Sequence, residues 1–219
     1  MGTSRVTKCA IGAVLVLLAS AAGVHGSIII FTANYEFSGT GVSPEGTAPW
    51  LTVTIDDGVN DTDGIVTLTF QATNLTGSEY VDKLYLNLDP ILDPTKLQFT
   101  SPVQTGTFEL PGISKDVNAY KADGDGEFDI EFSFATVEDD RFGADEAVKY
   151  TVSGIAGLTA DSFDFPSNPK KSGDPSFPFA AHVNSIGPGA KSGWVSTPEP
   201  ATMALMAAGF GLIAVRRRR

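Results

Sequence analysis

The chain of 219 residues is acidic, with 26 Asp and Glu residues against 15 Lys and Arg residues and a formal charge of −11. This balance disfavours nucleic acid and anionic lipid as partners, because both repel an acidic surface. A single cysteine excludes a disulfide framework and cysteine-based zinc sites, and two histidines are too few for a histidine-based zinc site.

The first 26 residues have the layout of a secretory signal peptide. Arg5 and Lys8 form a basic start, residues 10–18 are apolar, and small residues follow up to position 26. The apolar run of about nine residues is too short for a bilayer core of about 30 Å, so we expect no permanent N-terminal anchor. A buried N-terminal helix is the alternative, but the order of the charges favours export through a translocon.

Two positions fit a cut by signal peptidase, because small residues occupy both key sites before each of them. One cut would follow Ala21 and the other would follow Gly26. The strand-like segment 27–31 favours the second position, between Gly26 and Ser27. We therefore expect a signal peptide over residues 1–26.

Apolar and polar residues alternate repeatedly between residues 27 and 196, which indicates β-strands with one buried face each. Short strands of this kind predict two packed antiparallel sheets. We expect an all-β domain over 27–196, an antiparallel β-sandwich of about eight to ten strands, with a jelly roll as one topology that the pattern allows. The longest loop, 167–175, is expected to be mobile. The expected buried faces come from the segments 51–55, 66–70, 84–88, 128–134, 148–152 and 177–183.

The acidic segment from Asp123 to Asp129 raises the question of calcium binding, because Ca²⁺ prefers several closely spaced carboxylate and carbonyl oxygens. Asp123, Asp125 and Asp129 are the weak candidate ligands. The spacing departs from the EF-hand, since Phe128 occupies the position where that loop needs glycine. A hairpin turn that leads into an acidic strand explains the same residues, and we favour it. We therefore expect no metal ion and no other cofactor, with calcium as the open alternative.

The expected domain lacks a recognisable set of catalytic residues. Only His182 remains once the signal peptide is removed, and no nucleophile elbow or phosphate-binding glycine loop occurs. We therefore expect no enzyme activity, although a glycosidase-type pair of carboxylates stays open, because distances between acids cannot be read from sequence. Aromatic residues can also stack on sugars, but in a small sandwich they more often pack in the core. The residues considered for stacking are Trp50, Trp194, Tyr35, Tyr80, Tyr85 and Tyr120.

A short motif, an apolar run and a basic cluster follow one another over residues 197–219. Pro198, Glu199 and Pro200 precede the apolar residues 201–215. As a helix this run would be about 22 Å long, and local thinning of the bilayer would absorb the mismatch. We expect a transmembrane helix whose basic end stays in the cytoplasm, which leaves the domain outside. The basic cluster consists of Arg216, Arg217, Arg218 and Arg219.

This succession resembles the PEP-CTERM sorting signal, whose bearers also carry an N-terminal signal peptide. The resemblance implies recognition by an exosortase, a membrane cysteine protease-transpeptidase, with Pro198, Glu199 and Pro200 as the recognition element. It also implies delivery to the cell surface or to extracellular polymer. The segments 50–90 and 179–195 further resemble a β domain that recurs among PEP-CTERM proteins and for which no catalytic activity is implied.

Together these features predict an exported, non-enzymatic bacterial protein of the cell surface or extracellular matrix. An inner-membrane anchor would hold it transiently until an exosortase processes it, and extracellular polysaccharide is a candidate partner. The body between the two signals has 9 basic and 25 acidic residues, a formal charge near −16, which again disfavours nucleic acid. A secreted carbohydrate-binding module, assisted by calcium, is the alternative function, and a secreted glycoside hydrolase is a third.

Overall fold

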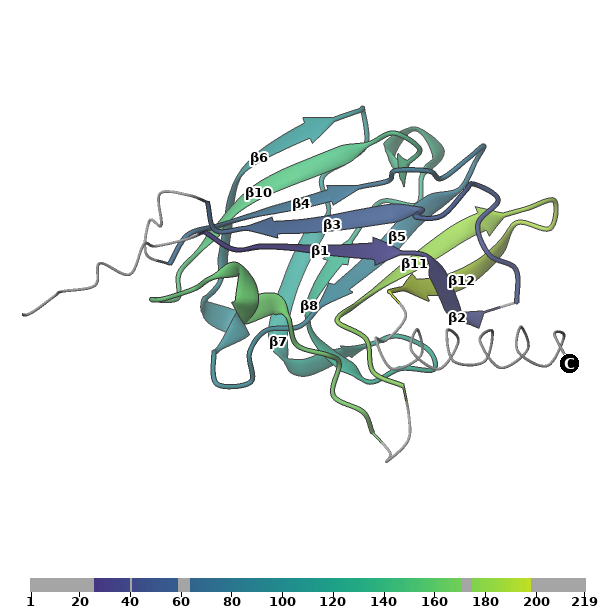
Figure 1. The fold of residues 1–219 in the computed structure, drawn as a ribbon. Coiled ribbons are helices and arrows are strands. Elements are labelled where there is room, and N and C mark those ends of the chain that lie inside the picture. The colour runs from purple at the N-terminus through teal and green to yellow at the C-terminus, as the bar shows by residue number, and fades with distance from the viewer. Residues whose placement is uncertain (1–25, 40, 59–63, 171–174, 198–219) are drawn as a thin grey trace, which may run out of the picture.

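Two antiparallel β-sheets packed face to face form the folded body of the chain (Figure 1). The computed structural model describes residues 26–39, 41–58, 64–170 and 175–197. The five-stranded sheet has the order β1 (Ile28–Ala33), β3 (Leu51–Asp56), β4 (Val66–Gln71), β10 (Ala147–Ser153) and β6 (Gln98–Thr105). The seven-stranded sheet has the order β2 (Tyr35–Gly39), β12 (Lys191–Ser196), β11 (Phe179–Ile186), β5 (Tyr80–Leu86), β8 (Glu127–Ser133) and β7 (Gly112–Lys121), and β9 (Phe142–Gly143) pairs with β5. The connections contain three short 3₁₀ helices, η1 (Pro94–Lys96), η2 (Glu138–Asp140) and η3 (Ala160–Phe163).

The interior between the sheets is apolar and rich in aromatic rings. Phe70 of β4 meets Phe132 of β8 edge-on, with ring centroids 4.5 Å apart. Phe31 of β1 stacks on Phe179 of β11 at 5.8 Å. Removal of this apolar area from water is the main stabilising term for such a fold. The apolar positions that the sequence assigned to the buried faces of β3, β4, β5, β10 and β11 are all buried, which confirms these strands.

A single bend lets one segment of the chain contribute to both sheets. β1 pairs with β3 in the five-stranded sheet, and β2 pairs with β12 in the seven-stranded sheet. Only Asn34 separates β1 from β2, and its amide donates a hydrogen bond of 3.1 Å to the carbonyl of Ser196. Figure 1 shows β1 running directly into β2 at this bend, which ties the two layers together along one side.

The structure confirms an all-β fold with antiparallel sheets, and no α-helix occurs among the described residues. The described residues form twelve strands rather than the expected eight to ten. Three hairpins connect strands that are neighbours within one sheet, namely β3–β4, β7–β8 and β11–β12.

Neither of the two expected targeting segments can be compared with the fold. The signal peptide up to residue 25 and the apolar run 201–215 lie outside the described residues. Within the described part of the chain, no helix has the length and apolar character needed to cross a membrane.

Of the strands that the sequence alternation did not reveal, β2, β6 and β7 lie at sheet edges, whereas β12 lies inside the seven-stranded sheet. β6 and β7, which end the two sheets on one side, contain no fully buried residue. β9 has only two residues. Because a regular alternation of apolar residues arises only where one face is buried, these strands leave a weak pattern in the sequence.

One expected buried face is divided between two clusters. The later apolar residues of the segment 128–134 pack between the sheets, as predicted. Phe128 instead packs on the outer face of the seven-stranded sheet, so the prediction was wrong for this residue. The reason is a shift in the pairing of β7 with β8 between Lys115 and Tyr120, which interrupts the two-residue period. We call this second group the outer cluster, and it consists of Tyr85, Ala122, Phe128, Ala180 and Trp194, with Phe37 and Tyr120 packed against it.

Candidate functional site

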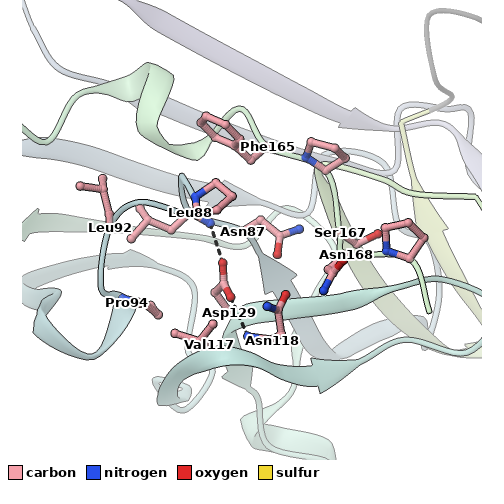
Figure 2. A pocket seen from close by; sticks show the side chains of 13 residues that line it. Asn87, Leu88, Leu92, Pro94, Val117, Asn118, Asp129, Phe165, Ser167 and Asn168 are labelled. Carbon is pink, nitrogen blue, oxygen red and sulfur yellow. Dashed lines mark hydrogen bonds between the residues drawn. The ribbon is translucent and has the colours of Figure 1, made fainter. Parts of the chain in front are cut away.

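A pocket of about 410 Å³ opens beside the end of β5 and the irregular part of β7. Its walls come from the segment after β5, from β7 and β8, and from the loop that follows η3 (Figure 2). The volume falls in the range of about 300–1,000 Å³ that is typical of small-molecule sites. The polar side chains in the walls belong to Asn87, Asn118, Asp129, Ser167 and Asn168.

Asp129 of β8 joins two walls of this pocket. Its Oδ2 accepts a hydrogen bond of 3.1 Å from the backbone N–H of Leu88, and its Oδ1 accepts one of 2.8 Å from the backbone N–H of Asn118 (Figure 2). Leu88 follows the end of β5, and Asn118 lies in the irregular part of β7 with a φ of 49°. The carboxylate thus takes the place of sheet hydrogen bonds at the point where β5 and β7 no longer pair regularly with β8. Since a carboxylate can accept about four hydrogen bonds, it keeps acceptor capacity for a ligand.

Asn87 presents an unused hydrogen-bond donor to the same pocket. The residue is 3 % exposed, and its buried Nδ2 has no hydrogen-bond partner in the described part of the chain. A buried polar atom without a partner costs about 1–3 kcal/mol. Figure 2 shows the amide between Asp129 on one side and Ser167 and Asn168 on the other. An acceptor from outside the chain, in water or in a ligand, would therefore lower the free energy of this site.

The sequence did not point to Asn87, because it lies in the run Leu-Asn-Leu-Asp-Pro, which reads as a strand with the asparagine on its solvent side. β5 ends at Leu86 instead, and both Asn87 and Leu88 are buried. The available signal was Pro90, which has no N–H to donate to a neighbouring strand and therefore favours the end of the strand before it.

The loop after η3 is fixed against the start of β8 and forms the far wall of the pocket. Glu127 and Asn168 exchange two backbone hydrogen bonds of 2.9 Å each. Ser167 is 1 % exposed, its hydroxyl donates to Asp125, and its backbone N–H donates to the carbonyl of Phe177 at 2.8 Å. The first two residues of the segment 167–175 are thus hydrogen-bonded to neighbouring parts of the fold, and one of these contacts is a buried one with a carboxylate.

The close approach of this loop to β8 requires glycine at position 126. A Cβ at Gly126 would collide with the backbone carbonyl of Asn168 and with the hydroxyl of Ser167. Backbone atoms cannot turn aside as the end of a flexible side chain can. Gly126 is thus needed for the contact between the two segments, whereas Gly124 has a φ of 79° and serves the turn itself.

The calcium candidates lie at the hairpin between β7 and β8, as the favoured interpretation predicted. Asp125 accepts a hydrogen bond from the Ser167 hydroxyl, and Asp129 is engaged with two backbone amides. No group of three or more His, Cys, Asp or Glu side chains that could hold a metal ion occurs in the described residues. The structure therefore does not bring Asp123, Asp125 and Asp129 together as ligands.

His182 of β11 lies on the outer face of the seven-stranded sheet, opposite its apolar neighbours, as predicted. Its Nδ1 is 2.8 Å from Oδ1 of Asp82 and 3.4 Å from Nδ2 of Asn184, and its ring lies 4.8 Å from that of Trp194. General-base catalysis needs a nucleophile within reach of the ring. Among the described residues, no hydroxyl or thiol is hydrogen-bonded to it.

Most of the aromatic residues considered for sugar stacking are covered. Trp50, Tyr85 and Trp194 are each at most 8 % exposed. The guanidinium of Arg141 lies over the ring of Tyr80, 4.2 Å from its centroid. Packing within the protein therefore explains these rings, whereas Tyr35 is exposed and Tyr80 and Tyr120 are partly exposed.

Both ends of the described body are fixed by side-chain hydrogen bonds. The backbone N–H of Ser27 lies 2.5 Å from Oδ1 of Asp57, and the Ser27 hydroxyl donates to Asp161 at 2.9 Å. At the other end, the hydroxyl of Thr197 donates to the carbonyl of Thr32 at 2.9 Å and accepts from its N–H at 3.1 Å. The expected signal-peptide cut and the sorting motif thus lie directly next to these fixed points.

The expected sorting residues, from Pro198 to Arg219, lie outside the described residues. The PEP-CTERM protein-sorting motif matches residues 196–219, which confirms the resemblance seen in the sequence. Searches of curated proteins and of solved structures found no match. The motif implies an exported protein that is targeted by an exosortase and is anchored transiently in a membrane.

Proposed function

We propose that this exosortase-targeted chain is a non-enzymatic protein of the bacterial cell surface or extracellular matrix. The translocon exports it, signal peptidase removes residues 1–26, and the C-terminal helix holds it in the inner membrane. An exosortase then processes it at Pro198, Glu199 and Pro200 and releases it into, or attaches it to, extracellular polysaccharide. The observation that carries this proposal is the PEP-CTERM motif at residues 196–219.

The C-terminal end of the fold supports a boundary between the folded domain and the sorting motif after Thr197. Ser196 is fully buried, and Thr197 is hydrogen-bonded in both directions to Thr32. The sorting motif therefore begins at the first residue after the folded body, without an intervening linker. An exosortase that cuts near Pro198 would leave the domain intact.

The N-terminal end supports a cut between Gly26 and Ser27. Cleavage there would convert the amide nitrogen of Ser27 into an ammonium group, and this nitrogen lies 2.5 Å from Oδ1 of Asp57. The hydroxyl of Ser27 is bonded to the carboxylate of Asp161, so a second negative charge is close by. An ammonium beside two carboxylates gains a favourable charge interaction that a cut after Ala21 would not produce.

The proposal is tested by the intact mass of the protein recovered from membrane, surface and medium fractions of its native host. We expect a species that begins at Ser27 and ends near Pro198 in the surface or medium fraction. A cell-associated species that retains Arg219 would contradict exosortase processing and leave a plain membrane-anchored protein. A species that begins at Ala22 would contradict only the position of the signal-peptide cut and would leave the rest of the proposal standing.

Carbohydrate binding is the second candidate function, and the pocket beside β5 is the observation that favours it. Glycan arrays with and without a chelator test it on the whole molecule. Binding that survives the chelator would support a calcium-independent module, and absence of binding in both states would remove this candidate.

A further inference from the structure

We infer that the pocket beside β5 binds a neutral, hydroxyl-rich ligand, such as one sugar ring of a polysaccharide, with Asn87 and Asp129 as the recognition pair. This inference deepens the carbohydrate-binding candidate and rests on it, while it is independent of sorting. It assigns the ligand to this pocket rather than to the exposed aromatic residues that the sequence suggested.

The hydrogen-bonding groups of the pocket select the chemistry of the ligand. Nδ2 of Asn87 is a donor without a partner in the described chain, and Asp129 is an acceptor with two of its hydrogen bonds already used. A ligand must therefore offer an acceptor to Asn87 and a donor to Asp129. A hydroxyl group offers both, and neighbouring hydroxyls on a sugar ring offer them side by side.

The remaining walls suit the apolar face of such a ring. Phe165, Pro166 and Pro169 come from the loop after η3, and Pro90 and Leu92 come from the segment after β5. Small-molecule sites commonly combine walls of this kind with a few fixed polar groups that set the orientation of the ligand. The polar groups here are fixed, because Asp129 is held by two backbone amides and Ser167 by Asp125.

Charge argues against ionic ligands. No Lys, Arg or His residue is among the described residues that line the pocket. The nearby Lys170 is paired with Glu127 at 2.6 Å, so it offers no free charge to an anion. A metal ion is disfavoured as well, because no suitable group of ligating side chains occurs in the described residues and Asp129 alone supplies too few oxygens.

Water is the competing occupant. A pocket of about 410 Å³ would hold several molecules, since each needs about 30 Å³. The apolar walls give most of these molecules few partners. A ligand that displaces them and keeps the hydrogen bond to Asn87 therefore gains affinity.

The test follows ¹⁵N-labelled full-length protein in detergent by NMR, during titration with glucose, galactose, mannose, N-acetylglucosamine and, as the charged counterpart, glucuronate. We expect at least one neutral sugar to shift the side-chain amide of Asn87 and the backbone amide of Asn118, and we expect glucuronate to bind at least tenfold more weakly. This measurement on the wild type needs no variant to fold. If none of the neutral sugars shifts these signals, water is the only occupant and the inference is wrong.

A pair of variants then separates recognition from folding. Asn87→Leu should weaken sugar binding at least tenfold while the denaturation midpoint stays equal or rises, because the unpaired buried amide is removed. Asn184→Leu, on β11 and away from the pocket, is the matched control and should bind as the wild type does. Sugar binding that survives Asn87→Leu would overturn the inference.

The result remains distinct from the test of the broader candidate. A positive glycan array together with unchanged Asn87 signals would keep carbohydrate binding and move its site elsewhere. A negative array together with unchanged signals would remove both.

Discussion

The two sheets share one interior but differ on their outer faces. On the five-stranded sheet, the outer positions of β3 and β4 hold partly exposed threonines such as Thr54 and Thr69. On the seven-stranded sheet, the same kind of position holds Tyr85 and Trp194, which are 4 % and 8 % exposed. An antiparallel sheet commonly packs one face on a core and leaves the other face solvated. A sheet that is covered on both faces can also bury polar groups. The strands that line the pocket with Asn87 and Asp129, β7 and β8, both belong to the seven-stranded sheet, and the segments after β5 and η3 complete its walls.

A substitution in the interior between the two sheets should give the largest loss of stability, with which substitutions on the outer faces can be compared. Phe132 is fully buried and meets Phe70 at 4.5 Å and Phe99 at 5.4 Å. We expect Phe132→Ala to lower the free energy of unfolding by about 3–5 kcal/mol, because it removes buried area and leaves a cavity. Urea denaturation measures this loss.

The matched control for that variant is Val103→Ala, at a position of β6 that is 60 % exposed. It should change the free energy of unfolding by no more than about 0.5 kcal/mol. Equal losses in Phe132→Ala and Val103→Ala would mean that the space between the sheets is not the main core.

The outer cluster should behave as a second, smaller core. Trp194 stacks on Tyr85 at 5.2 Å and packs against His182 at 4.8 Å. We expect Trp194→Ala to lower the free energy of unfolding by about 3 kcal/mol, the lower end of the range for large aromatic residues. Thr69→Ala, at an outer position of the five-stranded sheet, should cost less than about 0.5 kcal/mol. If the two variants unfolded at the same urea concentration, the difference between the outer faces would have no energetic meaning.

The same difference explains what could be predicted from the sequence. The alternation in β3 and β4 was readable, because Thr54 and Thr69 face water while their neighbours are buried. At the start of β8 this contrast fails, since Phe128 and Asp129 are both buried next to an irregular pairing. The sorting motif could be recognised for a different reason, because it is defined by the succession of residues along the chain rather than by packing.

The pocket could not be predicted, because it depends on contacts between distant segments. Asn87 and Asp129 are 42 positions apart in the chain, and the loop with Ser167 closes the far wall. Nothing local to Ser167 indicates that its hydroxyl is buried against Asp125. The sequence predicted a turn just before Asp129 and a loop that contains Ser167, but it did not predict that these two segments touch.

Gly126 provides a direct test of that contact. We expect Gly126→Ala to lower the free energy of unfolding by about 1–3 kcal/mol, because its methyl group would push against the backbone of Asn168. The backbone amide signal of Asn168 should shift and exchange faster with solvent, because its bond to Glu127 is strained. Gly112→Ala is the control, since an added Cβ has no neighbour within 4 Å there. An unchanged Asn168 amide in Gly126→Ala would show that the loop is not held by this approach.

The smallest effect concerns charge on the covered sheet. Glu131 and Lys83 form an ion pair of 3.1 Å beside Tyr85. Burial raises the pKa of the Glu131 carboxyl, but the hydroxyl of Ser133 and the ammonium of Lys83 outweigh it, so the pKa lies below its ordinary value. A carboxyl whose pKa is lowered by folding stabilises the protein above its unfolded pKa of about 4.3. This stabilisation is lost as the pH falls through the lowered pKa.

We therefore expect Glu131→Gln to lower the free energy of unfolding at pH 7 by a few tenths of a kcal/mol, the usual range for a partly exposed ion pair. The difference from the wild type should shrink when urea denaturation is repeated at about pH 3, because the wild-type carboxyl is then largely protonated. Glu109→Gln is the control, at an exposed position without an ion pair among the described residues, and its small effect should not depend on pH in this way. A difference for Glu131→Gln that is the same at both pH values would assign the effect to packing against Tyr85 rather than to ionisation. The outer face of the seven-stranded sheet would then be held by its aromatic rings alone.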